Sequence, residues 1–310
     1  MNDMNYPVKS FDESTYLKLN PDVSEAVQNR SFSSGWEHYI SYGFYENRPG
    51  VPFEVYKAIK DIMEDDKSFP PEQLRKRVHG DENLSSFVNI GRIVSFNIYS
   101  SINSMIELGE HRFILDFGCG CGRVIRYFHK FSGNSSFYGT DIDEEAISWC
   151  QHELSQIGKF VKNEESPRLP FGDEFFDFVY SISVFTHLPE DMQFVWLEEL
   201  RRVTKRGGYL LLTTHGEDLF KATSEESNRQ FRKKGFYYSI GARTEGLPDF
   251  YQTSFHTKDY IYSYWSKFFE IKKFIKKGIA NNQDLILCKK RAGLGNAQQD
   301  DPADADKPRR

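Results

Sequence analysis

A short apolar run that breaks into alternating glycines constrains this chain most. Residues 113–117 are typical of a strand buried in a parallel sheet. Glycines follow at every second position, and apolar residues then recur at helical spacing from Val124 to Phe128. The order strand, glycine turn, helix predicts backbone N–H groups and a helix N-terminus that face a closely approaching ligand. The motif reads Asp116-Phe117-Gly118-Cys119-Gly120-Cys121-Gly122-Arg123.

Two ligand classes use such a turn, and the pattern of neither is present. A dinucleotide-binding turn has Gly-x-Gly-x-x-Gly, but Arg123 occupies the third glycine position. A phosphate loop has Gly-Lys-Ser/Thr, which does not follow. Asp116 lies at the end of the strand instead, where a carboxylate would repel a pyrophosphate but suits a ligand with an ammonium group. An NAD-linked oxidoreductase is therefore the disfavoured alternative.

A second acid follows the next predicted strand, residues 137–139. Asp141 lies roughly 20 residues beyond the glycine turn, the spacing at which an acid reaches ribose hydroxyls bound at the strand ends. The alternative role is an N-cap for a helix over residues 144–153, and both roles fit this short stretch. We predict Asp141 as the ribose ligand.

These motifs resemble those of class I S-adenosylmethionine-dependent methyltransferases. The predicted fourth strand, residues 175–182, continues into Ser183-Val184-Phe185-Thr186-His187, which matches the fourth motif of the family. The resemblance implies a Rossmann-like, doubly wound, seven-stranded α/β sheet, mostly parallel with an antiparallel last strand and a helical N-terminal extension. A narrower likeness rests on motifs over about residues 70–290, among them Pro71-x-x-Leu74-Arg75-x-Arg77-Val78-His79-Gly80, Tyr251-Gln252-Thr253-x-Phe255-His256 and Asn282-Gln283-Asp284. These motifs resemble those of a bacterial methyltransferase group often encoded with glycan-modifying proteins.

The resemblance implies S-adenosylmethionine as cofactor and a set of binding residues. Ile142 would offer an apolar surface to adenine, and a polar group past the third strand would bond its amine; Asn163, Glu164 and Glu165 are the alternatives. The predicted cofactor-binding residues are Asp116, Gly118, Cys119, Gly120, Arg123, Asp141, Ile142, Asn163, Glu164, Ser181 and Ser183.

Three histidines are the candidate catalytic residues. Methyl transfer to an oxygen needs proton removal, and histidine is the natural base near neutral pH. His187, His215 and His256 each follow a strand or lie in an insertion, and His187 is the first choice because its loop borders the methyl position in this fold. For each of them a structural hydrogen bond is the alternative role.

Several classes of function are disfavoured by composition. A net charge of −5 gives no general attraction to nucleic acid, and no run is apolar and long enough to span a membrane. The segment 1–10 lacks the apolar centre of a signal peptide. The four cysteines form neither a disulfide framework nor a metal motif, which favours a reduced cytoplasmic enzyme without a metal site. Ser181-Ile182-Ser183-Val184 stands where methyltransferases of base or glutamine amino groups have Asp/Asn-Pro-Pro-Tyr/Phe.

We predict four parts. Residues 1–50 are a small aromatic-rich helical module, 51–110 a helical cap, 111–290 the methyltransferase domain with a lid or acceptor insertion at 216–265, and 291–310 a disordered tail. The motifs Tyr16-Leu17-Lys18-Leu19-Asn20-Pro21-Asp22-Val23 and Gly35-Trp36-Glu37-His38-Tyr39 resemble those of a module found beside glycosyltransferase and methyltransferase domains of bacterial surface-glycan systems. The alternative is a helical cap that only buries its own aromatic side chains. In the cap, Arg75, Arg77 and His79 either face ligand or form a solvated surface.

The function predicted from the sequence is methyl transfer to an acceptor, an oxygen of a glycan or small metabolite. The alternative is a non-catalytic cofactor-binding module, docked to a glycan-assembly complex through residues 11–50. Lysines between residues 267 and 290 fit either an anionic acceptor or the solvated edge of a hairpin.

Overall fold

The computed structural model describes residues 11–32, 34–44, 46–63, 67–108, 110–241 and 247–292. The predicted disordered tail lies almost wholly outside these residues, and so does the segment 1–10. Among the described helices, none combines the length and the apolar character that crossing a bilayer requires.

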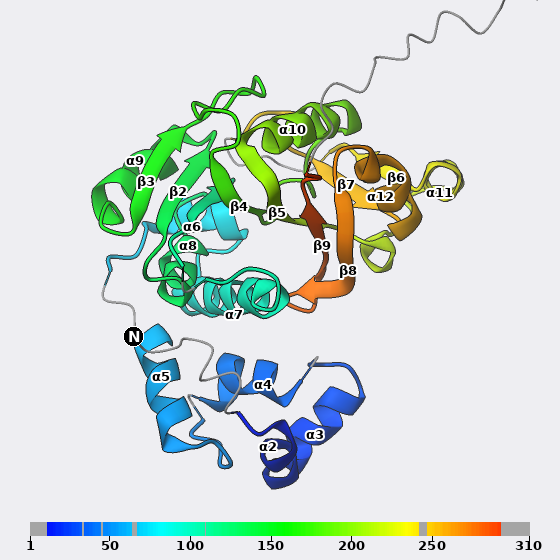
Figure 1. The fold of residues 1–310 in the computed structure, drawn as a ribbon. Helices are drawn as coiled ribbons and strands as arrows, with labels where there is room; N and C mark the ends of the chain where they lie inside the picture. The colour runs from blue at the N-terminus through cyan, green and yellow to red at the C-terminus, as the bar shows by residue number, and fades with distance from the viewer. Residues whose placement is uncertain are drawn as a thin grey trace, which may run out of the picture.

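Seven strands form one sheet in the order β3-β2-β1-β4-β5-β9-β8. The pairs from β3 to β5 are parallel, whereas β9 is antiparallel to β5 and to β8. This confirms the predicted doubly wound, mostly parallel sheet with an antiparallel last strand (Figure 1). The strands are β1 (Phe113–Phe117), β2 (Ser136–Asp141), β3 (Gly158–Lys162), β4 (Phe176–Ser181), β5 (Thr204–Thr214), β8 (Glu270–Ile279) and β9 (Gln283–Lys289).

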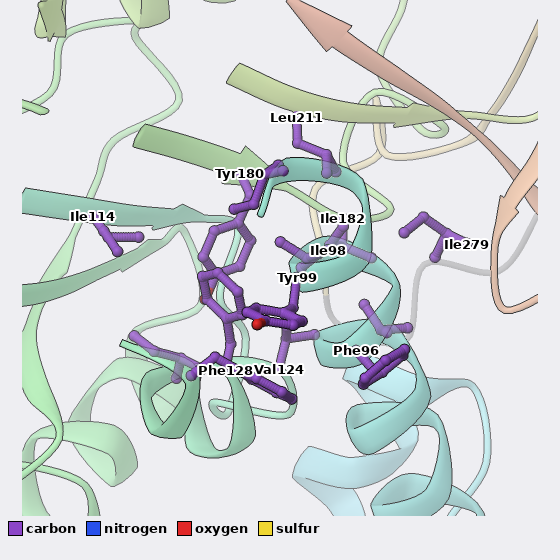
Figure 2. Close-up of a cluster of buried hydrophobic side chains, with 14 of the residues drawn as sticks. Phe96, Ile98, Tyr99, Ile114, Val124, Phe128, Tyr180, Ile182, Leu211 and Ile279 are labelled. Atoms are coloured by element: carbon purple, nitrogen blue, oxygen red, sulfur yellow. The ribbon is translucent and has the colours of Figure 1, made fainter. Parts of the chain in front are cut away.

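Alternate residues of the central strands point into two apolar layers. Ile114 of β1 packs with α7, α8 and α9, whereas its neighbour Leu115 packs with α10 and α12. Figure 2 shows the first layer, in which aromatic and aliphatic side chains fill the space between α7, α8 and the sheet. The helices are α6 (Glu72–His79), α7 (Leu84–Ile102), α8 (Ile125–Phe128), α9 (Glu144–Glu153), α10 (Glu190–Val203) and α12 (Lys258–Tyr264).

Two local features differ from the sequence prediction. The helix after the glycine turn, α8, has only four residues before a 3-10 turn at His129–Phe131, so it offers little helix dipole to a ligand. A pair of glycines after an amphipathic helix predicts the end of that helix, but strand β5 begins at Thr204, directly after α10, and contains Gly207 and Gly208.

The insertion after β5 is folded, although it shows little apolar periodicity. It contains a 3-10 turn (Glu217–Leu219), α11 (Glu225–Lys234), β6 (Phe236–Ser239) and β7 (Thr253–His256), with β6 and β7 paired antiparallel. A bridge between His215 and Phe255 joins this small sheet to the end of β5. The insertion is thereby fixed beside the carboxyl ends of the central strands.

The N-terminal module packs against the sheet domain through an aromatic core. Trp36 meets Phe96 of α7 with ring centroids 4.9 Å apart, and Asn281 in the β8–β9 turn donates to the carbonyls of Arg30 and Ser31. Figure 1 shows the module lying along α7. Its helices are α2 (Glu13–Leu19), α3 (Pro21–Gln28) and α4 (Gly35–His38), the last followed by a π-helical turn at Tyr39–Gly43. The next helix, α5 (Phe53–Met63), comes after the module.

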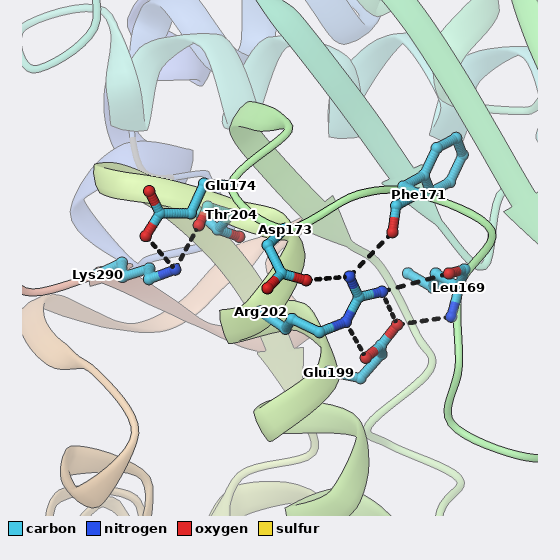
Figure 3. Close-up of polar contacts among 8 residues, drawn as sticks. All are labelled: Leu169, Phe171, Asp173, Glu174, Glu199, Arg202, Thr204 and Lys290. Atoms are coloured by element: carbon cyan, nitrogen blue, oxygen red, sulfur yellow. Dashed lines mark hydrogen bonds and ion pairs between the residues drawn. The ribbon is translucent and has the colours of Figure 1, made fainter. Parts of the chain in front are cut away.

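One acid of α10 is buried, although helical spacing predicts it on the outer face with its neighbours. Glu199 is only 5% exposed, accepts the N–H of Leu169 at 2.6 Å and pairs with Arg202 at 2.6 Å. Arg202 also donates to the carbonyl of Phe171 and pairs with Asp173 (Figure 3). This network ties the loop between β3 and β4 to α10.

We expect Glu199→Ala to lower the free energy of unfolding by about 3 kcal/mol, because it removes the buried carboxylate of the ion pair with Arg202 and leaves the buried N–H of Leu169 without its acceptor. The matched control is Glu198→Ala, which removes only an exposed pair with Arg201 and should cost less than about 1 kcal/mol. Urea unfolding of the two variants measures the difference. Equal losses would contradict the buried network.

Candidate functional site

A cavity opens at the carboxyl ends of β1, β2 and β4. The glycine turn, residues 141–143, residues 163–165 and residues 182–184 line it, and α6 and the insertion close it with Val78 and Tyr251. All predicted cofactor residues except Ser181 line this first cavity. Ser181 lies fully buried in β4, and its hydroxyl has no hydrogen-bond partner among the described residues.

The glycine turn requires glycine for two physical reasons. Gly118, Gly120 and Gly122 all have left-handed backbone, with φ values of 80°, 51° and 77°. A Cβ at Gly118 would lie 2.1 Å from Val184, and one at Gly120 would lie 2.6 Å from Val78. The turn therefore presents bare main chain to the first cavity.

The N–H groups of Gly118, Cys119 and Gly120 are already hydrogen-bonded within the protein, whereas the sequence predicts that the turn's N–H groups face a ligand. Gly118 and Cys119 both donate to the carbonyl of Thr140, at 2.8 and 2.9 Å, and Gly120 donates to Asp141 Oδ2 at 2.7 Å. The turn is thus bonded to the end of β2. A ligand can still approach the main chain of the turn closely, because the glycines carry no side chains.

Asp116 is a buried carboxylate with an unused oxygen. It is 2% exposed, lines the first cavity, and its Oδ2 has no hydrogen-bond partner within the described part of the chain. Burial raises its pKa to about 8, while Tyr180 and Arg123 act in the opposite direction. A ligand ammonium group would supply the missing partner and favour the ionised carboxylate.

Asp141 lines the same cavity from the end of β2. Its Oδ2 accepts from Gly120 and its Oδ1 accepts from the N–H of Asp143 at 2.9 Å. Burial raises its pKa, and these two backbone donors oppose that rise. Each carboxylate oxygen keeps a lone pair for a ligand hydroxyl. The N-cap of α9 is Asp143, which accepts from Glu145 and Ala146, so Asp141 does not cap that helix.

Asn163, Glu164 and Glu165 all remain candidates for the contact with the adenine amine. Asn163 is 6% exposed and donates its side-chain N–H to the carbonyl of Glu164. Glu164 and Glu165 are exposed at the rim. Ile142 lines the cavity beside Asp141 and offers the apolar surface that a flat base needs.

A second cavity adjoins the first. Arg123, Ser183 and Tyr251 line both, so they form part of the wall between them. Ser183 has left-handed backbone (φ 62°), and its hydroxyl accepts from Gln283 at 2.7 Å. Tyr251 donates its hydroxyl to the carbonyl of Ser183 at 3.0 Å, which joins the insertion to the loop after β4.

Of the three predicted catalytic histidines, only His187 lines one of these two cavities, namely the second cavity. Its Nδ1 bonds to the carbonyl of Gln252, so this nitrogen carries the proton. Its ring stacks on Tyr251 with centroids 4.3 Å apart. Burial lowers its pKa, which keeps the ring neutral near pH 7. The ring's Nε2 forms no hydrogen bond with the described residues and is therefore a free acceptor.

His215 and His256 line neither cavity. His256 is 1% exposed and bonds through Nε2 to Gln193 at 2.9 Å, within an aromatic cluster of the insertion. His215 lies with its ring 5.9 Å from that of His187, and burial lowers its pKa to about 4. The structure brings His187 and His215 together but separates His256 from both cavities.

Sequence reasoning did not select Val78, Tyr251 or Gln283 as site residues, although all three line a cavity. Tyr251 and Gln283 lie inside the motifs that carry the narrower likeness, so a signal was present. Val78 lies in another of these motifs, but its packing against Gly120 could not be predicted, because it depends on how α6 folds back over the turn.

Comparison with known proteins finds a methyltransferase domain in the part of the chain that carries this site. Residues 115–212, from β1 to β5, match the family model described as a methyltransferase domain. Over these residues, the match and the strand order support a class I S-adenosylmethionine-dependent methyltransferase domain. The family and the fold imply S-adenosylmethionine as the cofactor. Asp116, Asp141 and the bare glycine turn fit the ammonium, the ribose and the close approach of that molecule.

Curated relatives match over part of their length. The chain is 32% identical over 117 residues to phthiotriol/phenolphthiotriol dimycocerosates methyltransferase 1 of Mycobacterium ulcerans, covering 38% of this chain and 42% of the relative. It is 28% identical over 210 residues to tRNA (carboxymethyluridine(34)-5-O)-methyltransferase of Arabidopsis thaliana, covering 59% and 49%. It is 29% identical over 119 residues to a fatty-acid O-methyltransferase of Mycolicibacterium smegmatis, covering 38% and 42%. The chain therefore spans less than half the length of these relatives.

Among solved structures, a SAM-dependent methyltransferase from Methanosarcina mazei aligns at 22% identity and a TM-score of 0.47, covering 63% of this chain and 99% of its own. One from Aquifex aeolicus aligns at 16% identity and a TM-score of 0.44, covering 72% and 99%.

We expect Asp116→Asn to stabilise the ligand-free protein increasingly as the pH rises. The unfolded carboxyl ionises near its ordinary pKa, whereas the folded one ionises only at about 8. The folded state therefore holds an extra proton between these values, and wild-type stability falls with rising pH. Asparagine does not ionise, so the difference should grow by about 1.4 kcal/mol per pH unit between about pH 5 and pH 7.

Urea unfolding at three pH values measures this difference. The control is Asp259→Asn, an exposed position in the first turn of α12, whose curve should run parallel to that of the wild type. A parallel curve for Asp116→Asn as well would contradict the buried, unpaired carboxylate.

Proposed function

We propose that this chain is an S-adenosylmethionine-dependent methyltransferase that transfers a methyl group to an oxygen of a glycan or small metabolite. The observation that carries the proposal is the pair of adjoining cavities. The first is lined by the glycine turn and two acids, and the second by a neutral histidine with a free Nε2.

In the first cavity, Asp116 takes the ammonium group and Asp141 takes the ribose hydroxyls. Ile142 covers one face of the adenine, and Asn163, Glu164 or Glu165 accepts a hydrogen bond from its amine. Gly118, Cys119 and Gly120 let the ligand approach the main chain. Arg123 and Ser183, on the wall between the cavities, adjoin the methionine part. Ser181, which lies behind this wall in β4, supports it from the core.

In the second cavity, His187 acts as the base. The sulfonium of S-adenosylmethionine supplies an electrophilic methyl group and leaves as a neutral thioether. His187 Nε2 takes the acceptor's hydroxyl proton while the oxygen forms its bond to carbon. The Gln252 carbonyl holds the required tautomer and stabilises the imidazolium that forms. Positioning of the acceptor and exclusion of water supply the rest of the rate enhancement.

An oxygen acceptor is supported by this free base and by two relatives that are named for O-methylation, one of a tRNA uridine and the other of a fatty acid. The glycan acceptor rests on the narrower likeness alone. Four buried free thiols fit a reducing compartment, and we place the protein in the cytoplasm.

The second candidate function is a cofactor-binding module without turnover that docks to a glycan-assembly complex. It is favoured by apolar side chains exposed on the N-terminal module and the helix after it: Leu19 at 50%, Tyr42 at 48% and Phe53 at 71%. Cofactor binding without methyl transfer to any acceptor would distinguish it from the enzyme.

We expect Asp141→Ala to weaken binding of S-adenosylhomocysteine at least about tenfold, a loss of about 1.4 kcal/mol, because the ribose loses its acceptor. Isothermal titration calorimetry measures the dissociation constant, and a thermal melt checks that the variant folds. Asp259→Asn is the control and should bind like the wild type. Absence of binding heat with both the wild type and the variant would refute the cofactor assignment.

We expect His187→Gln to lower kcat by a factor of about 10² to 10⁴ and to leave the affinity for S-adenosylhomocysteine unchanged. Methyl-labelled cofactor and a small-molecule extract provide the assay. In the wild type, kcat/KM should rise with pH through a pKa below the ordinary histidine value and then stay level, because the neutral ring is the active form. His152→Gln, at an exposed position of α9, is the control. Full activity of His187→Gln would exclude this base.

A further inference from the structure

The second cavity has a strongly one-sided charge. Lys76, Arg77 and His79 of α6 line it, together with Arg123 from the glycine turn. None of its described lining residues is an aspartate or a glutamate. A cavity of this kind favours a negatively charged occupant.

Two of these cations lack an acidic partner. Arg77 is neutralised by Asp143 at 3.0 Å and Glu145 at 2.5 Å. For Lys76 and Arg123, in contrast, no ion pair with another described residue occurs. Lys76 is exposed at the mouth of the second cavity and does not line the first.

Arg123 is the more informative of the two, because it is buried. It is only 9% exposed, and its Nε has no hydrogen-bond partner among the described residues. Its Nη1 donates a hydrogen bond to His79 Nδ1 at 2.8 Å. His79 accepts there and donates through Nε2 to Ser86, so it is neutral and supplies no negative charge.

A buried guanidinium without an ion pair is costly, because the more distant charge of Asp116 offsets its desolvation only in part. A carboxylate or phosphate of a ligand would offset that cost, since the planar fork of arginine matches both groups. Further polar groups line the same cavity: Asn282, Thr253 and the amide of Gln283, whose Oε1 has no partner among the described residues. These groups suit hydroxyls elsewhere on the same ligand.

We infer that the acceptor of the methyl group is an anion, whose phosphate or carboxylate binds between Lys76 and Arg123. This inference rests on the proposed function, since it takes the second cavity as the acceptor site. The sequence pointed to an anion for another reason, the lysines of the terminal hairpin. Those lysines line neither cavity, and Lys276 and Lys277 pair with Asp218.

The anion has one competing source, the carboxylate of the cofactor itself, because Arg123 also lines the first cavity. The test therefore measures melting temperatures of the full chain with inorganic phosphate, and separately with citrate, at constant ionic strength. Each titration is run without and with saturating S-adenosylhomocysteine, which brings its own carboxylate to the first cavity. The variants are Lys76→Gln, Arg123→Gln and the control Lys159→Gln, an exposed lysine of β3 outside both cavities.

We expect phosphate or citrate to raise the melting temperature of the wild type and of Lys159→Gln, also when S-adenosylhomocysteine is bound. The shift should fall at least twofold in Lys76→Gln and vanish in Arg123→Gln. Phosphate acting alone indicates a phosphorylated acceptor, and citrate acting alone indicates a carboxylated one.

Two results would overturn the inference. One is a shift that S-adenosylhomocysteine abolishes, which would assign Arg123 to the cofactor's carboxylate. The other is an equal shift, or none, in the wild type and both site variants, which would leave only general salt stabilisation. Binding of S-adenosylhomocysteine is measured separately, by calorimetry, and its absence would refute the proposed function. The anion titration of the ligand-free protein would still test whether the second cavity binds anions.

Discussion

The site depends on one interaction between neighbouring strand ends, the hydrogen bond from the N–H of Gly120 to the carboxylate of Asp141. Together with the two bonds to the carbonyl of Thr140, it fixes the glycine turn against β2. The turn can then adopt three left-handed residues in close succession without relying on a ligand for its hydrogen bonds. The same carboxylate faces the first cavity, so the group that shapes the turn is also the group proposed to hold the ribose.

The placement of His187 follows from backbone pairing between two segments far apart in the sequence. The N–H of Gln252 donates to the carbonyl of His187, and the N–H of Ser254 donates to that of Thr186. The loop after β4 is therefore held by the insertion on one side and by β5 on the other, where Ser183 donates to Thr213. Such a frame fixes both the ring's position and its tautomer, which a base on a free loop would lack.

Most of the fold could be predicted from the sequence, because alternating apolar strands and helices define a doubly wound sheet and the glycine motif locates its first turn. The strand order and the antiparallel last strand agree with the resemblance. The hydrogen bonds of the turn could not be predicted, since they depend on the carbonyl of Thr140 in the adjacent strand. Burial of Glu199 depends likewise on Leu169, thirty positions earlier. The spacing of apolar residues along a helix does not show which side chains another loop will cover.

The N-terminal module bears on the second cavity through the elements it contacts. Trp36 packs on α7, the helix that contributes Ile90 and Val94 to that cavity. Its other contact is the β8–β9 turn, where Asn281 binds the module and its neighbours Ala280 and Asn282 line the cavity. None of the module's own described residues lines either cavity. Its contacts therefore support the walls of the proposed acceptor site. The module can position these walls through its buried face and still dock to a partner through its exposed surface.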